Sequence, residues 1–291
     1  MKQYKDLLRH VMDEGQIKQC RQGVPTLSTF NYNYEHDLRD GFPILTGKKI
    51  FWKSVVIENL WFLGRSRKID FLHKHGVKFW DQWADEKGNL PQAYGEFWRD
   101  FPNYQIGGEF PDEIECDIGF DQFDAILGEL ASNPNSRRLV LTNWYPPSAW
   151  RSKLPPCHLL AIFNVQYEHN GNHRLCLHMT QRSCDVPVGV PFNIAGYGFI
   201  LQLVSHLSGI EPGIFGHTLV DAHIYMNQMD GVEEYMKRSI SPLPTLKISD
   251  RIKSMKDLDE LIEDGTTKEI MGCFVLEGYN PQPYIPIEVL V

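Results

Sequence analysis

LLAIFNVQYEHNGNHRLCLHMTQ, residues 159–181, is the stretch that decides the fold class. Two apolar runs in it flank Asn170-Gly171, and an Asn-Gly pair between two such runs favours the type I′ turn of a β-hairpin. We therefore predict two antiparallel strands over 161–167 and 174–179.

Outside the hairpin, helices and strands fall in separate parts of the chain. Helical periodicity of apolar residues is found at 4–14, 53–63, 120–130, 194–208 and 257–262. Alternation of apolar and polar residues, or a composition typical of strands, predicts strands at 26–45, 137–142, 221–225, 243–248 and 274–276. Because strands and helices do not alternate as βαβ units require, the predicted class is α+β. No linker or charge block divides the chain, so we expect a single domain over residues 1–291.

Composition narrows the function classes. The chain has 291 residues and 42% hydrophobic content, enough for a large core. Its 29 Lys+Arg against 37 Asp+Glu give a formal charge of −8, which opposes general nucleic-acid binding. The longest uncharged stretch, 186–210, contains two prolines, so we expect a buried helix rather than a membrane span. Six cysteines without a CxxC pair, and an N-terminus without an apolar signal segment, predict a cytoplasmic protein with free thiols.

Cys157 is the candidate nucleophile. It follows Pro155-Pro156, which stiffen the entry to a strand and can hold a thiol at a fixed angle. His158 is not its obvious base, because neighbouring residues on a strand point to opposite faces. Activation then needs a cation such as Arg182 from elsewhere in the fold. The alternative is a buried structural cysteine.

Arginines predict an anion site. The guanidinium group suits phosphate, and Ser183 adds a hydroxyl donor. The alternative for each is a surface ion pair with one of the many carboxylates. The candidates outside obviously solvated faces are Arg21, Arg137, Arg138 and Arg182.

Several other polar residues stand in patterns that suit substrate binding. Glu58 lies in the middle of an apolar helix, where burial would raise its pKa towards neutrality, or where it has one structural partner. Asn193 can read the edge of a planar ring or cap a helix that starts at 194. Asp221, His223 and Tyr225 share one strand face, which either binds sugar hydroxyls or meets solvent.

The common metal and cofactor motifs are missing from the sequence. It holds no HExxH, no paired CxxC and no carboxylate cluster near His223, so we expect no metal. Gly189, Gly196 and Gly198 form neither GxGxxG nor a phosphate-binding loop with Lys-Ser/Thr. The sequence therefore predicts neither a Rossmann cofactor nor a nucleoside triphosphate as a ligand.

Taken in order, the motifs resemble the thymidylate synthase family over nearly the whole chain. The resemblance implies a homodimeric α+β fold, with a large mixed sheet flanked by helices and one sheet face forming the dimer interface. It also implies a deoxynucleoside monophosphate substrate and methylenetetrahydrofolate as co-substrate. The motifs are Pro156-Cys157-His158, Gln181-Arg182-Ser183 with Asp185, Gly189-Val190-Pro191-Phe192-Asn193-Ile194-Ala195, Asp221-Ala222-His223-Ile224-Tyr225 and Glu277-Gly278-Tyr279.

The resemblance also implies catalytic roles. Cys157 would add to C6 of the pyrimidine, Glu58 would organise water and protons, and Tyr94 would assist removal of the C5 proton. Asn193 would read the base edge, and Asp185 would seat the folate ring.

Binding roles follow in the same way. Arg21, Arg182 and Ser183 would hold the 5′-phosphate, joined by two arginines of the second subunit, and two residues of the 221–225 strand would hold the 3′-hydroxyl. The remaining implied residues are Arg137 and Arg138 across the interface, His223 and Tyr225 at the sugar, and Trp80, Asp185, Gly189, Phe192 and Val291 at the folate.

Departures from the usual family pattern gather around the folate, the ordered water and the closing tail. They include Gln22 for threonine, Gln228 and Gln282 for histidines, and Pro187 for a larger or more flexible residue. This distribution makes the chain resemble the pyrimidine nucleotide hydroxymethylases of the family, in which water rather than hydride completes the reaction. Neutral drift in a divergent synthase is the alternative.

The predicted reaction is therefore hydroxymethylation of deoxyuridylate (dUMP) to 5-hydroxymethyl-dUMP, a precursor for modified DNA. Asn193 favours uracil, because the cytosine-specific hydroxymethylases resembling this family carry aspartate there. The alternatives are reductive methylation to thymidylate and, in another class, an inactive nucleotide-binding paralogue. Such hydroxymethylases resemble viral enzymes, so we expect the cytoplasm of an infected host.

Overall fold

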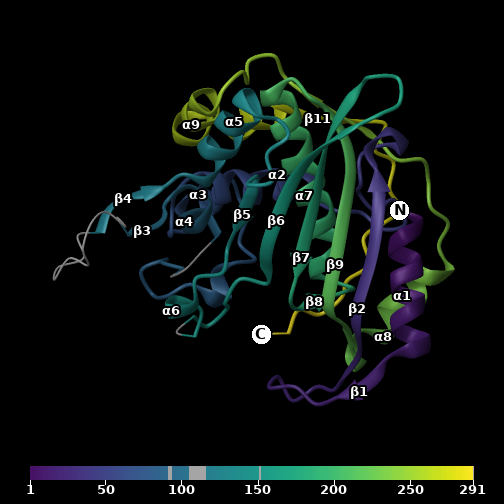
Figure 1. The fold of residues 1–291 in the computed structure, drawn as a ribbon. Helices are drawn as coiled ribbons and strands as arrows, with labels where there is room; N and C mark the ends of the chain where they lie inside the picture. The colour runs from purple at the N-terminus through teal and green to yellow at the C-terminus, as the bar shows by residue number, and fades with distance from the viewer. Residues whose placement is uncertain (91–93, 105–115, 151, 291) are drawn as a thin grey trace.

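A mixed β-sheet is the centre of the computed structural model, which describes residues 1–90, 94–104, 116–150 and 152–290 (Figure 1). Its strand order is β1-β2-β9-β7-β6-β5, with the short β8 paired to β9. Most pairs are antiparallel, but β7 and β8 run parallel to β9. The strands are β1 (Gln16–Lys18), β2 (Thr26–Asp37), β5 (Val140–Thr142), β6 (His158–Tyr167), β7 (His173–Gln181), β8 (Cys184–Asp185) and β9 (Glu211–Tyr225).

The predicted hairpin is confirmed, but its predicted type I′ turn is wrong, because Gly171 has a positive φ and Asn170 does not. Strands β6 and β7 pair antiparallel from His158↔Gln181 to Tyr167↔His173. Gly171 in the turn has φ +88°, a conformation that glycine adopts at no steric cost. The chain then crosses through α7 to enter β9, which is why β7 and β9 are parallel.

Helices cover one side of this sheet. In Figure 1, α2 and α7 lie behind it and α1 lies beside β2. Two small antiparallel pairs, β3–β4 and β10–β11, lie outside the main sheet. The bounds are α1 (Lys2–Glu14), α2 (Trp52–Leu63), α3 (Asp70–Lys74), α4 (Tyr94–Arg99), α5 (Gln122–Ser132), α6 (Pro146–Ala149), α7 (Gly189–Ser208), α8 (Met229–Lys237), α9 (Met255–Asp264), α10 (Thr267–Cys273), β3 (Phe101–Tyr104), β4 (Cys116–Phe120), β10 (Thr245–Ile248) and β11 (Phe274–Glu277). The mixed α+β class is as predicted.

Some predicted boundaries are wrong. Helix α7 begins at Gly189 instead of 194, because Pro191 in its first turn has no hydrogen bond to lose there. Asn193 is therefore inside the helix, and the capping interpretation fails. The predicted strand region 26–45 holds one strand, which ends at Asp37 before a 3-10 turn. Strand β5 begins at Val140, so Arg137 and Arg138 precede it.

The largest apolar cluster joins the helices to the inner face of the sheet. It includes Leu8 of α1, Leu60 of α2, Phe199 of α7 and Phe215 of β9, all fully buried. Helix α2 is buried continuously from Val55 to Leu63, as its apolar sequence predicts. In the described part of the chain, no helix is long and apolar enough to cross a membrane.

Candidate active site

A cavity of about 720 Å³ contains most of the predicted site residues. Its walls come from the β1–β2 loop, α2, the segment around Trp80, the loop before β6, the β7–β8 turn, the start of α7, the end of β9 and the C-terminal segment. The predicted residues that line it are Arg21, Glu58, Trp80, Tyr94, Cys157, Arg182, Ser183, Asp185, Gly189, Phe192, Asn193, His223 and Tyr225.

Three predicted residues are not among them. Arg137 and Arg138 are exposed before β5 and do not line the cavity. Val291 lies outside the described residues.

Cys157 is held by its backbone at the entry to β6. The Tyr94 hydroxyl accepts hydrogen bonds from the backbone N–H groups of Cys157 (2.8 Å) and His158 (3.5 Å). Burial raises the pKa of the Cys157 thiol, and the positive charges of Arg182 and Arg21 act in the opposite direction. The predicted cationic neighbours are thus present, and Tyr94 places its hydroxyl directly at the loop that carries the thiol.

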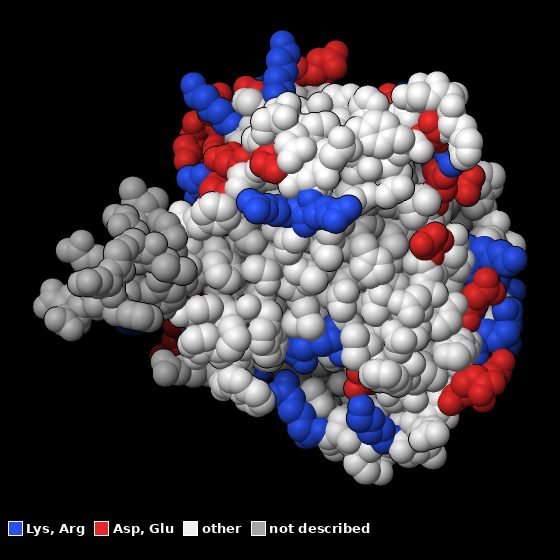
Figure 2. Space-filling view, in the orientation of Figure 1, with Lys and Arg blue, Asp and Glu red and all other residues white. Residues whose placement is uncertain are grey.

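Arg182 is fixed alongside this loop. Its Nε donates to the carbonyl of Pro156 (3.0 Å), its Nη2 donates to Pro155 (2.7 Å), and its guanidinium lies 5.6 Å from the ring centre of Trp144. The cavity lining holds five basic and three acidic side chains. Figure 2 shows Lys and Arg side chains in and around a hollow in the lower half of the face. A small anion is therefore the ligand that this wall favours.

Glu58 presents a carboxyl group from the buried helix α2. Its Oε1 accepts a hydrogen bond from Nε1 of Trp80 at 2.8 Å. Burial raises the pKa of Glu58 to about 7, with the Trp80 bond opposing the shift. A carboxyl group with this pKa exchanges its proton near neutrality, as the sequence predicts.

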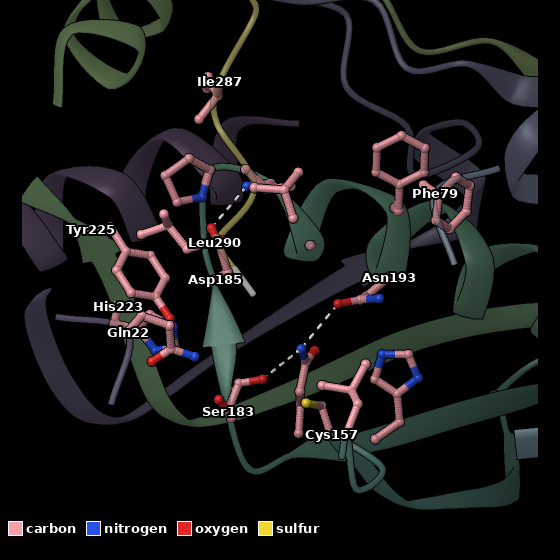
Figure 3. A pocket seen from close by; sticks show the side chains of 18 of the residues that line it. Gln22, Phe79, Cys157, Ser183, Asp185, Asn193, His223, Tyr225, Ile287 and Leu290 are labelled. Carbon is pink, nitrogen blue, oxygen red and sulfur yellow. Dashed lines mark hydrogen bonds between the residues drawn. The ribbon is translucent and has the colours of Figure 1, made fainter. Parts of the chain in front are cut away.

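A relay of side chains fixes the amide of Asn193 (Figure 3). Its Oδ1 accepts from Nε2 of Gln181 at 3.0 Å, and Oε1 of Gln181 pairs with Nε2 of His217 at 3.1 Å. Nδ1 of His217 pairs with the hydroxyl of buried Tyr34 at 2.9 Å. The sequence analysis assigned no role to Gln181. Gln181 is a polar residue at the end of a strand, on the face that points into the core. A buried polar residue in such a position needs a partner, and this signal would have identified Gln181.

The end of β9 brings its three polar side chains to the cavity. His223 and Tyr225 are 8% and 7% exposed, so the solvent-facing alternative is wrong for both. Asp221 accepts hydrogen bonds from Lys18 (2.6 Å) and Ser28 (2.8 Å), and Nδ1 of His223 lies 3.4 Å from its Oδ1. The contact with His223 is the main cause that holds the pKa of Asp221 well below its usual range.

Asp185 and Lys48 form a further part of the cavity wall, and Asp185 is the strand partner of His223 across β8 and β9. Oδ1 of Asp185 accepts from the backbone of Val188 (3.1 Å), and its Oδ2 accepts from Gln228 (3.2 Å). Burial raises the pKa of Asp185. Lys48, which the sequence analysis missed, donates to the carbonyl of Pro187 at 2.6 Å, and burial lowers its pKa to about 8.

This wall suits a large aromatic ligand with an anionic end. Four aromatic side chains and the neighbouring Lys48 and Lys49 are among the residues that line the cavity. The aromatic residues are Phe79, Trp80, Trp83 and Phe192. No group of three metal-ligating side chains comes together in the ranges that the structure describes.

A family model described as thymidylate synthase matches residues 2–291.

Proposed function

Because the chain belongs to the thymidylate synthase family, we propose that it hydroxymethylates C5 of dUMP, with methylenetetrahydrofolate as co-substrate and water completing the reaction. Members of the family are folate-dependent one-carbon transferases that act on dUMP. The observation that carries the proposal is one cavity in which Cys157 lies with Arg21, a fixed Arg182, a buried carboxyl group and an oriented amide.

The nucleotide would bind along the wall that runs from Arg21 to β9. Arg21, Arg182 and Ser183 bind the 5′-phosphate, and His223 and Tyr225 bind the 3′-hydroxyl. Asn193 presents an amide to the uracil edge, and the bond to Gln181 keeps it in one orientation. These contacts place C6 against the Cys157 sulfur, which forms a C–S bond there and leaves C5 electron-rich.

Proton handling falls to Glu58 and Tyr94. Glu58, with a pKa of about 7, holds a proton below neutrality and releases it above. Tyr94 stays protonated, because burial raises the pKa of its hydroxyl well above the usual range. The Tyr94 oxygen accepts a hydrogen bond from the backbone N–H of Cys157. The hydroxyl proton of Tyr94 can therefore be donated in a hydrogen bond towards the pyrimidine base.

Methylenetetrahydrofolate supplies the one-carbon unit when bound. Asp185, Gly189, Phe192 and Trp80 would hold its ring system. Trp80 is oriented by the bond to Glu58, so ring position and proton handling are linked through one indole N–H.

A side-chain amide in the cavity favours water as the final reactant. Gln22 lines the cavity beside Arg21. Its amide can hydrogen-bond water inside the cavity.

Reductive methylation to thymidylate is the second candidate. Ile287, Val289 and Leu290 line the cavity from the C-terminal segment, and Trp80 is only 8% exposed. An apolar cover of this kind excludes water and protects a hydride transfer.

One assay separates these functions. The protein is incubated with dUMP and methylenetetrahydrofolate, and both the nucleotide mass and the absorbance of dihydrofolate are followed. A hydroxymethyl product without dihydrofolate supports the proposal, whereas a methyl product with stoichiometric dihydrofolate replaces it with the second candidate. Turnover of deoxycytidylate alone would contradict the role of Asn193. Binding of dUMP without turnover of either nucleotide would support the inactive paralogue.

We also propose that residues 1–291 form one catalytic domain that works as a homodimer. Arg137 and Arg138 are exposed and away from their own cavity, which suits donation to the phosphate site of a second subunit.

A further inference from the structure

Gln228 is a buried amide, 2% exposed, at which three parts of the site meet. Its Nε2 donates to Oδ2 of Asp185 at 3.2 Å and to the carbonyl of Glu288 at 3.0 Å. Its Oε1 accepts from the backbone N–H of Tyr225 at 3.2 Å. One side chain thus contacts the folate wall, the C-terminal segment and the end of the sugar-binding strand.

The C-terminal segment reaches Gln228 along an anchored path. Gln282 donates from its backbone to the carbonyl of Thr46 at 2.8 Å, and Arg238 donates to the carbonyl of Pro283. Ile287 packs so closely on Gly231 that a Cβ there would lie 2.7 Å from it. The bond to Glu288 comes next along the chain, directly before Val289 and Leu290, which line the cavity. Figure 3 labels Ile287 and Leu290 of this segment.

The geometry of an amide makes the two donor bonds dependent on each other. Both N–H bonds belong to one planar NH2 group, so holding one of them fixes the direction of the other. When the carbonyl of Glu288 is in place, the second N–H points at Asp185. Histidine is the usual residue at this position in the family. A neutral histidine has one N–H and can donate to only one of the two acceptors, Asp185 or the carbonyl of Glu288.

We propose that Gln228 is a positioning residue that couples docking of the C-terminal segment to the carboxylate of Asp185. The inference rests on the proposed function, because it takes Asp185 as part of the folate site. The proposal predicts that a change at Gln228 both loosens the C-terminal segment and weakens folate binding.

Gln228→Glu is the sharpest variant, because it keeps the size and the acceptor for Tyr225 but removes both N–H donors. We expect the KM for methylenetetrahydrofolate and the Kd for tetrahydrofolate to rise about tenfold, the loss typical of one charge-assisted hydrogen bond. The Kd for dUMP should change less than about twofold, because the acceptor for Tyr225 is kept. In the ligand-free protein, carboxypeptidase should release Leu290 and Val289 about tenfold faster.

Asn227→Ala is the matched control. Asn227 donates to the side chain of the same Glu288 at 2.8 Å, but it is exposed and its bond does not reach Asp185. All four quantities should stay within about twofold of the original protein. If thermal unfolding shows that Gln228→Glu does not fold, Gln228→Met replaces it for folate binding and carboxypeptidase release only, because methionine removes the same donors without adding a charge but also removes the acceptor for Tyr225.

Two outcomes overturn the proposal. If both carboxypeptidase release (trimming) and folate binding are unchanged, Gln228 positions neither the C-terminal segment nor Asp185. If trimming is faster but folate binding is unchanged, Gln228 anchors only the segment. Trimming is measured without substrate, so it tests Gln228 even if the product assay rejects hydroxymethylation.

Discussion

A thiol among apolar atoms reacts only when its surroundings favour the thiolate, and Cys157 has Arg182 and Arg21 for this purpose. We expect Cys157→Ala to lower kcat by at least about 10⁴-fold, because the covalent step has no other nucleophile. The Kd for dUMP, measured by calorimetry, should stay within about threefold. Cys20→Ala, which also removes a thiol from the cavity wall, should keep most of the activity. Product formation by Cys157→Ala would rule out its role.

The buried carboxyl group of Glu58 makes stability depend on pH. Its pKa is raised from 4.5 to about 7, so the folded protein binds a proton more tightly than the unfolded chain does. The resulting stabilisation is fully present below pH 4.5 and is lost as the pH rises through about 7. As the pH rises from 4.5 to 8, the free energy of unfolding of Glu58→Gln should therefore increase by about 3 kcal/mol relative to that of the original protein.

Urea unfolding at a series of pH values measures this difference. Glu260→Gln, which changes an exposed carboxylate on α9, should follow the original protein throughout. A Glu58→Gln stability difference that is the same at pH 5 and pH 8 would mean that the Glu58 carboxyl group does not titrate in this range.

Sequence reasoning at the residue scale succeeded where one residue's surroundings are local. The apolar neighbours of Glu58 lie on its own helix, so its burial was predictable. It failed where the partner is distant in the chain. Gln181 meets His217 only because β7 and β9 pair in parallel, and Lys48 meets Pro187 across more than a hundred residues.

At the scale of elements, the signals were strongest where a special backbone conformation is required. The Asn170-Gly171 pair located the hairpin, although only Gly171 adopts the positive φ that such a pair is expected to supply. The start of α7 was missed because Pro191 indicates a helix end in most positions and is tolerated only in the first turn. Strand β9 was recognised only at its end, since its earlier residues lack a clear alternation.

Close packing between α7 and the loop after β2 gives a test at this scale. A Cβ on Gly198 would lie 2.4 Å from Cγ of Pro43, whose ring is rigid. Gly198→Ala should therefore destabilise the protein by about 1–3 kcal/mol. Gly128 in α5 has open space around it, so Gly128→Ala should stabilise by about 0.5–1 kcal/mol through helix propensity. Urea unfolding measures both, and two shifts of the same sign would contradict this packing argument.

At the scale of the whole molecule, the sheet has one covered and one open face. The helices α2 and α7 lie behind it in Figure 1, and the other face carries Ile162, Ile214 and Phe30 with 37%, 36% and 81% exposure. Exposed apolar residues on several strands of one sheet are typical of an interface between subunits. This surface was not predictable from alternation alone, because inward and outward positions are both apolar on β6.

Two inactive variants that restore each other would establish that the subunits share a site. If Arg137 and Arg138 bind the phosphate of a second subunit, as proposed, the Arg137→Glu/Arg138→Glu double variant should lose activity, while Cys157→Ala loses the proposed nucleophile. A dimer of one chain of each kind keeps one complete site, with Cys157 from one chain and both arginines from the other. Refolding an equal mixture should therefore recover activity from about a quarter of the sites, whereas each variant refolded alone stays inactive. An inactive mixture that sedimentation shows to be dimeric would mean that the arginines act within their own chain, and an active double variant alone would mean that they do not act at the site.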